Sequence, residues 1–252
     1  MKNPLDRRRF LASMIACPAC ASAALAQSPL PHWEYDGARG AENWGQLDNR
    51  FQACAVGSQQ SPIDLKGAVR ADVGGLDIRW EPQPFEVVNN GHTIQANAEA
   101  GSRLTLGRTA YELKQFHFHT PSEHAFDGRR TAMEAHFVHA ASDGKLAVVG
   151  VLMTAGKKHD AFAEIMKAAP KREGEAKLRR PINARSFLPE AREFFRYEGS
   201  LTTPPCSETV NWNVLRSTIE VAASDIDTFK GLFPMNARPL QAANRRFLLR
   251  NR

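Results

Sequence analysis

Long apolar runs, linkers, low-complexity tracts and internal repeats are missing from residues 29–252 of this 252-residue sequence. No segment reaches the roughly 20 apolar residues that cross a bilayer as a helix. The composition, 42% hydrophobic and 24% charged, is that of a globular protein and excludes a disordered chain, a collagen or a membrane bundle. We therefore expect one globular domain.

A strong net charge is missing as well. Residues 1–26 account for +3 of the formal charge of +6, so residues 27–252 carry only +3. A surface this weakly basic implies no nucleic-acid partner.

The first 26 residues have the layout of an export signal. A basic stretch from Lys2 to Arg9 precedes an Ala-rich apolar run from Phe10 to Leu25, and Ala24-Leu25-Ala26 forms a small-x-small cleavage site. We expect its removal to leave residues 27–252 as the mature domain, periplasmic or secreted and without a membrane anchor.

The type of signal leaves alternatives open. Arg7-Arg8-Arg9-Phe10-Leu11 resembles the core of a twin-arginine signal, which a receptor reads as an address. An ordinary secretory signal is one alternative, and a lipoprotein acylated at Cys17 is another.

Cysteines are few, and the four form two pairs. Cys17 and Cys20 lie inside the expected signal, so we assign them no function in the mature domain. Cys54 and Cys206 remain, and an even number in an oxidising compartment favours a disulfide.

Short runs of β-forming residues, separated by Gly, Asn and Pro, dominate the rest of the chain. Strands are expected at Leu76–Trp80, Phe85–Asn89, Thr93–Ala96, Arg103–Leu106, Tyr111–His119, Thr131–His139, Lys145–Met153 and Val210–Leu215. Helices are expected at His159–Ala169 and, after a Ser224 cap, at Asp225–Leu232. The predicted fold class is mostly β, with a sheet at the centre and peripheral helices.

Two of these strands carry a pattern of histidines. Because side chains alternate between the faces of a strand, Gln115, His117 and His119 share one face. Glu134 and His136 share a face of the second strand in the same way. If the two strands are antiparallel neighbours, three imidazoles converge.

Three neutral imidazoles and one open position are the ligand set of a catalytic zinc ion, whereas a structural site has a fourth side-chain ligand. A ligating imidazole also needs its second nitrogen held. Gln115 and Glu134 each lie two residues before a candidate ligand, on its own face, and can serve.

A cupin-type metal protein is an alternative from another class. His117, His119 and Glu123 match the first half of the cupin motif, in which the Glu is a ligand. The second half, P-x-G-x2-H-x3-N, has no counterpart here.

Several ordered blocks resemble those of the α-carbonic anhydrases. They are residues 32–33, 60–65 (QSPIDL), 89–92 (NNGH), 115–119 (QFHFH), 122–124 (SEH), 134–139 (EAHFVH), 199–205 (GSLTTPP) and 238–245 (RPLQAANR). The resemblance implies a single domain with a large, mainly antiparallel twisted sheet, short peripheral helices and zinc in a conical cleft. It implies reversible hydration of carbon dioxide to bicarbonate and a proton by a zinc-bound hydroxide.

The resemblance also assigns roles to residues of the metal centre. His117, His119 and His136 are the implied zinc ligands, and the backbone carbonyl of Asn236 is implied to hold His119. Gln115 and Glu134 are similar to the family residues that hold the other two ligands.

The implied catalytic residues are Thr202, Glu123 and His92. Thr202 accepts a hydrogen bond from the hydroxide and donates one to Glu123, which aims the nucleophile. His92 passes the proton to solvent, with a surface turn histidine as the alternative. The water network on this path is assigned to Tyr35, Asn90 and Gln95.

The implied substrate pocket is apolar, as carbon dioxide requires. Its residues are Val138, Val148, Leu201, Thr203, Val210 and Trp212. A non-enzymatic binding module of the same fold is the alternative function, but such members typically lack a zinc histidine. A homodimer is possible by analogy only.

Two further expectations concern residues outside this pocket. Cys54 and Cys206 occupy positions similar to those bridged in many extracellular members of the family. The histidines that remain are assigned structural or surface roles. They are His32, His124, His139 and His159.

Overall fold

The structure is a computed structural model that describes residues 29–251. The predicted export signal, its cleavage site, Cys17 and Cys20 lie outside the described residues and stay predictions. The chain divides into residues 1–30 and residues 31–252, and the second unit contains the fold. Among the described residues, no helix is both long and apolar enough to cross a membrane.

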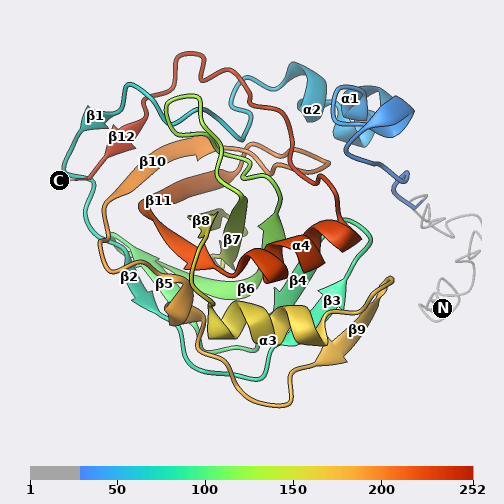
Figure 1. Ribbon diagram of the computed structural model, residues 1–252. Coiled ribbons are helices and arrows are strands. Elements are labelled where there is room, and N and C mark those ends of the chain that lie inside the picture. The colour runs from blue at the N-terminus through green and yellow to red at the C-terminus, as the bar shows by residue number, and fades with distance from the viewer. Residues whose placement is uncertain (1–28, 252) are drawn as a thin grey trace, which may run out of the picture. The chain divides into compact units, whose positions relative to one another are not determined.

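Short helices and many strands make up this unit (Figure 1). The α-helices are α1 (Trp44–Leu47), α2 (Ala53–Val56), α3 (Asp160–Ala168) and α4 (Ala223–Leu232), and the 3-10 helices are η1 (Gly37–Arg39), η2 (Asn49–Phe51) and η3 (Ala184–Phe187). The strands are β1 (Val69–Arg70), β2 (Asp77–Arg79), β3 (Glu86–Asn89), β4 (Ile94–Asn97), β5 (Arg103–Leu106), β6 (Thr109–His119), β7 (Met133–Ala140), β8 (Leu146–Ala155), β9 (Gly174–Lys177), β10 (Phe194–Gly199), β11 (Val210–Val221) and β12 (Leu249–Arg250).

All of these strands join one twelve-stranded sheet. Its order is β1-β12-β10-β11-β8-β7-β6-β4-β3-β9, and β5 pairs with both β6 and β2. Within the described chain every pairing is antiparallel except β1 with β12 and β8 with β11. The predicted large, mainly antiparallel sheet with short peripheral helices is confirmed.

The expected strands and helix caps were incomplete or wrong in places. Four strands were missed: β1 and β12 have only two residues each, β9 has no large apolar residue, and β10 carries two charged residues among its aromatic ones. In β10, Arg196 is held by the Asn213 side chain and the Val73 carbonyl. Helix α4 begins at Ala223, and no side chain caps it. The expected Ser224 cap is wrong because Ser224 lies inside the helix, where its carbonyl accepts a hydrogen bond from Thr228.

Side-chain alternation gives the central strands two different faces. Phe116 and Phe118 of β6 and Phe137 of β7 point into the larger hydrophobic core. Helices α3 and α4 lie over this face in Figure 1, where Phe162 and Phe229 contact Phe118. Each phenylalanine buried in this way contributes about 1.5–3 kcal/mol. The opposite face of the same strands carries the candidate metal ligands.

A disulfide joins Cys54, in α2, to Cys206, in the loop before β11. Hydrogen bonds to both cysteine carbonyls strengthen this junction: Gln60 donates to Cys206, and Arg238 donates to Cys54, each at 3.1 Å. The bridge therefore ties the N-terminal helices to the loop that contains Thr202.

Loss of the disulfide should destabilise the fold. The variant Cys54→Ser/Cys206→Ser is expected to lower the free energy of unfolding by about 2–5 kcal/mol, because the unfolded chain regains the entropy of a long loop. Urea unfolding of the oxidised protein and the variant measures this, with reduced wild type as the control that should match the variant. Equal stabilities of the oxidised protein and the variant would contradict it.

His139 is a fully buried histidine on the core face of β7. Trp80 Nε1 donates a hydrogen bond to His139 Nε2 at 2.9 Å, and His139 Nδ1 lies 3.2 Å from the Ala147 carbonyl oxygen. Since Nε2 accepts, the ring is neutral, with its proton on Nδ1. Burial lowers the pKa of His139 to about 4, although backbone carbonyls oppose the shift.

This depressed pKa should make stability depend on pH. The unfolded chain, with a His pKa of ~6.5, binds more protons, so the stability present at neutral pH is lost as the pH falls from ~6.5 to ~4, by roughly 3 kcal/mol in all. His139→Gln lacks this titration. In urea titrations its stability deficit relative to wild type should shrink by roughly that amount between pH 7 and pH 4. A deficit that stays constant over this range argues against a buried neutral His139.

Candidate metal centre

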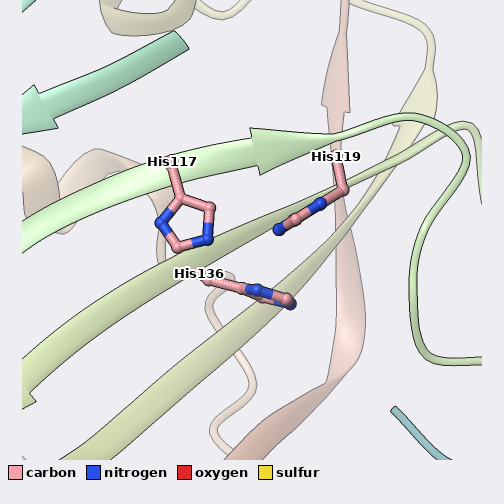
Figure 2. Close-up of side chains that lie close together, drawn as sticks. All are labelled: His117, His119 and His136. Atoms are coloured by element: carbon pink, nitrogen blue, oxygen red, sulfur yellow. The ribbon is translucent and has the colours of Figure 1, made fainter. Parts of the chain in front are cut away.

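Three histidines meet on the face of the sheet that lies opposite the large core. His117 and His119 come from β6, and His136 comes from β7, where it lies directly across the ladder from His117. Figure 2 shows the three rings turned toward one another. One ring nitrogen of each lies within 4.8 Å of the others, a spacing at which a single metal ion can bind all three.

The second nitrogen of each ring contacts a neighbouring oxygen. His117 Nδ1 lies 2.8 Å from Gln115 Oε1, and His119 Nδ1 lies 2.7 Å from the Asn236 carbonyl. His136 Nε2 lies 2.9 Å from Glu134 Oε1, close but poorly aligned for a hydrogen bond. The remaining nitrogens are Nε2 of His117, Nε2 of His119 and Nδ1 of His136.

These nitrogens fit a divalent cation. His119 Nε2 is buried and has no hydrogen-bond partner among the described residues. A buried polar atom without a partner costs free energy, and binding of a metal ion would offset that cost. Three imidazoles without a fourth side-chain ligand suit zinc with one open position.

The electrostatics favour neutral rings at two of the three positions. Burial is the main cause that lowers the pKa of His117 well below its usual value, and the neighbouring imidazoles add to it. Burial also lowers the pKa of His119. At His136 burial acts in the same direction but is outweighed by Glu134, so the pKa of His136 is raised. A metal ion binds the deprotonated nitrogen, so its binding releases any proton held there.

Glu123 is a buried carboxylate beside these rings. Its Oε1 accepts a hydrogen bond from the backbone N–H of Arg238 at 2.8 Å. Its Oε2 is buried without a hydrogen-bond partner, 3.5 Å from His119 Nε2. Thr202 is also buried, but within the described chain no hydrogen bond joins it to Glu123.

His92 lies on the turn between β3 and β4, and its ring is half-buried between aromatic neighbours. It stacks on Trp33 with ring centres 3.7 Å apart and lies 5.8 Å from the ring of His32. Burial, followed by His32, lowers the pKa of His92. The Asn90 side chain accepts hydrogen bonds from the His92 and Thr93 backbone N–H groups and so shapes the turn.

The other residues assigned to the water network occupy separate positions. Tyr35 contacts Trp33 and Trp44 edge to face, and burial, followed by the Glu123 charge, raises its pKa well above the usual value. Gln95 lies across the ladder from His117, and its amide donates to Asn97. Within the described chain, neither side chain is hydrogen-bonded to His92.

The residues assigned to the substrate pocket gather beside the metal centre. Val148, Val210 and Trp212 belong to one buried apolar cluster, and Val138 and Leu201 pack against it. The Trp212 ring lies 4.8 Å from the ring of His136. Thr203 is half-buried and lies outside this cluster.

Comparison with known proteins agrees with this arrangement. The model of the family described as "Eukaryotic-type carbonic anhydrase" matches residues 39–252. Curated proteins named carbonic anhydrase are similar along most of their length. The one from Neisseria gonorrhoeae is 38% identical, with 94% of each chain covered, and the one from Nostoc is 41% identical, with 89% of this chain and 88% of the relative covered. The chain belongs to the eukaryotic-type, or α, carbonic anhydrase family.

A solved structure agrees with this assignment. The α-carbonic anhydrase of Thermovibrio ammonificans, in complex with the inhibitor sulfanilamide, superposes with a TM-score of 0.85 at 37% identity, covering 86% of this chain and 98% of that one. The predicted enzyme class, carbonic anhydrase, is confirmed by this family membership, which implies carbon dioxide hydration. The cupin alternative is thereby excluded.

Three residues at this carbonic anhydrase site were not singled out from the sequence. His124 was assigned only a structural or surface role, yet it is fully buried and bonded to Glu134. Arg238 acts on Glu123 through its backbone, which no side-chain pattern indicates. Gly150 leaves room for Glu134, because an added Cβ would lie 3.0 Å from Glu134 Oε1. The signal that the sequence offered was the position of His124 directly after Glu123.

Proposed function

We propose that this protein hydrates carbon dioxide reversibly with a zinc ion held by His117, His119 and His136. The observation that carries the proposal is the convergence of three ring nitrogens whose opposite nitrogens face Gln115, Glu134 and the Asn236 carbonyl. When bound, zinc lowers the pKa of a coordinated water to about 7, as is established for carbonic anhydrases, and so supplies a nucleophilic oxygen near neutral pH.

Glu123 and Thr202 would orient that nucleophile. The backbone of Arg238 occupies one oxygen of Glu123, and the other has no partner among the described residues. An ionised carboxylate only accepts hydrogen bonds, so the Thr202 hydroxyl would donate its proton there. The Thr202 oxygen would then act as an acceptor and hold one hydrogen of the nucleophile, leaving its lone pair directed at carbon.

The apolar cluster beside His136 would bind the substrate. Carbon dioxide has no net charge or dipole, so it gains from leaving water for a wall of Val138, Val148 and Trp212 side chains. The same wall keeps competing water away from the reacting carbon.

His92 would carry the proton to solvent. Its ring is half-buried at the edge of the aromatic group around Trp33, and its lowered pKa lets it release a proton readily near neutral pH. Ordered water would have to bridge the gap to the metal centre, beside Tyr35, Asn90 and Gln95.

We also propose that the mature domain, residues 27–252, works in the periplasm or outside the cell. The disulfide supports this, because such bonds persist mainly in oxidising compartments. The basic and apolar layout of residues 1–26 supports it from the sequence.

The decisive experiment combines zinc analysis with stopped-flow carbon dioxide hydration. Wild type should bind about one zinc per chain and be active, whereas His119→Ala should lose zinc and fall to the uncatalysed rate, because two imidazoles cannot complete the site. His139→Gln, a buried histidine on the core face, is the matched control and should keep both. A wild type without stoichiometric zinc, or an active, zinc-free His119→Ala, would refute the proposal.

The proton path makes a separate prediction. His92→Ala should lower kcat roughly 100-fold at low buffer concentration, since proton release then lacks a positioned relay. Added imidazole should restore the rate, while zinc content stays at the wild-type level. If kcat is unchanged at low buffer concentration, His92 is not the relay.

A further inference from the structure

A chain of buried polar side chains runs from Glu134 away from the metal centre. Glu134 Oε1 lies 2.8 Å from His124 Nδ1, and His124 Nε2 lies 2.6 Å from the Tyr197 hydroxyl. The Tyr197 hydroxyl lies 3.0 Å from Ser61 Oγ. All four side chains are at most 2% exposed. The catalytic steps above use none of the last three.

Glu134 is held at one end of this chain by two contacts from His124. The His124 backbone N–H donates to one carboxylate oxygen at 2.8 Å, and His124 Nδ1 lies 2.8 Å from the other. Because an imidazole presents a nitrogen at each of two ring positions, the same ring can contact Glu134 through Nδ1 and Tyr197 through Nε2. The Tyr197 hydroxyl donates to Ser61 Oγ. Each member of the chain is therefore in hydrogen-bond contact with the next, from Glu134 to Ser61.

His124 controls the orientation of Glu134. Its ring bonds one carboxylate oxygen, and its backbone N–H donates to the other at 2.8 Å. Gly150 leaves room for this carboxylate, because an added Cβ on Gly150 would lie 3.0 Å from Glu134 Oε1. His124 therefore determines how the Glu134 carboxylate is oriented toward His136.

The far end of the chain reaches the loop that carries Thr202. Ser61 and Ser200 exchange two hydrogen bonds: the Ser61 N–H donates to Ser200 Oγ at 2.9 Å, and the Ser200 N–H donates to Ser61 Oγ at 3.1 Å. Trp212 Nε1 donates to the Ser200 carbonyl at 3.0 Å. This buried network therefore connects Ser200, two residues before Thr202 in the same loop, with the candidate ligand His136.

We propose that Ser61, Tyr197 and His124 are positioning residues, which hold the Glu134 carboxylate on His136 and couple this metal ligand to the Thr202 loop. The inference rests on the metal centre proposed above and deepens it. Buried polar groups of this kind are costly unless they are paired, so loss of one member should disturb its neighbours. The disturbance should reach His136 as a change in metal binding.

The test measures metal binding directly. Zinc dissociation constants are obtained by competition with a chromogenic chelator, and the visible spectrum of the cobalt(II)-substituted protein reports ligand geometry. Tyr197→Phe, which removes only the hydroxyl, should raise the zinc dissociation constant several-fold. His124→Gln should raise it roughly 10- to 100-fold, the range found when partners of metal ligands are lost. Both should change the cobalt spectrum.

Matched controls separate positioning from general stability. Tyr111→Phe removes the hydroxyl of a buried tyrosine on β6, and His139→Gln replaces a buried histidine on β7, the strand that carries Glu134 and His136. Both residues lie on the core side of the sheet. Each should leave zinc affinity within about twofold of wild type even where thermal stability falls. Ser61→Ala, the mildest change, serves if His124→Gln does not fold, and it should weaken zinc binding in the same direction as Tyr197→Phe.

The outcomes also separate this inference from the proposed function. A wild type that binds no zinc refutes the metal centre itself. A wild type that binds zinc tightly, with Tyr197→Phe and Ser61→Ala indistinguishable from Tyr111→Phe, overturns only the positioning role. In a Glu134→Gln background, Tyr197→Phe should have little further effect on zinc binding, whereas fully additive effects would show that it acts by another route.

Discussion

The alternation of side chains along β6 and β7 is the constraint on which the rest of this structure depends. His117 lies opposite His136 on one face of the ladder, while Phe116 lies opposite Phe137 on the other. A slip of one residue would exchange imidazoles and phenyl rings and place polar nitrogens in the large core. The hydrophobic core that stabilises the sheet therefore also sets the register of the metal centre.

Buried charged groups also depend on hydrogen bonds for their positions. The Arg238 guanidinium donates to Gln60, Ser61 and Cys54. Burial lowers its pKa to about 10, which still leaves it charged at neutral pH. Because the Arg238 backbone holds Glu123, the disulfide-linked N-terminal segment and the metal centre share an anchor. Ser61 belongs to this anchor and to the chain that ends at His136.

Apolar and polar surfaces meet at the candidate site, which suits the family chemistry. The cluster around Val148 and Trp212 offers an uncharged wall, whereas the three rings and Glu123 present polar atoms beside it. A small apolar molecule can approach the wall without losing hydrogen bonds, and the polar side can act on charge that develops during hydration. The division follows from the pairing of β7, β8 and β11, which places Val138, Val148 and Trp212 in adjacent registers.

The sequence by itself determined the strands with clear alternation, the candidate ligands and the family, because period-two spacing and ordered motifs are local properties of the chain. It did not determine β1, β9, β10 and β12, which are very short or carry charged residues, or the start of α4. Only the tertiary structure decided that Asn236 faces His119, that Arg238 holds Glu123, and that Ser61 and Tyr197 reach His124. His119 and Asn236 are 117 positions apart in the sequence, and Ser61 and Tyr197 are 136 positions apart. Spacing along a sequence carries no information about contacts that form only when the sheet brings distant loops together.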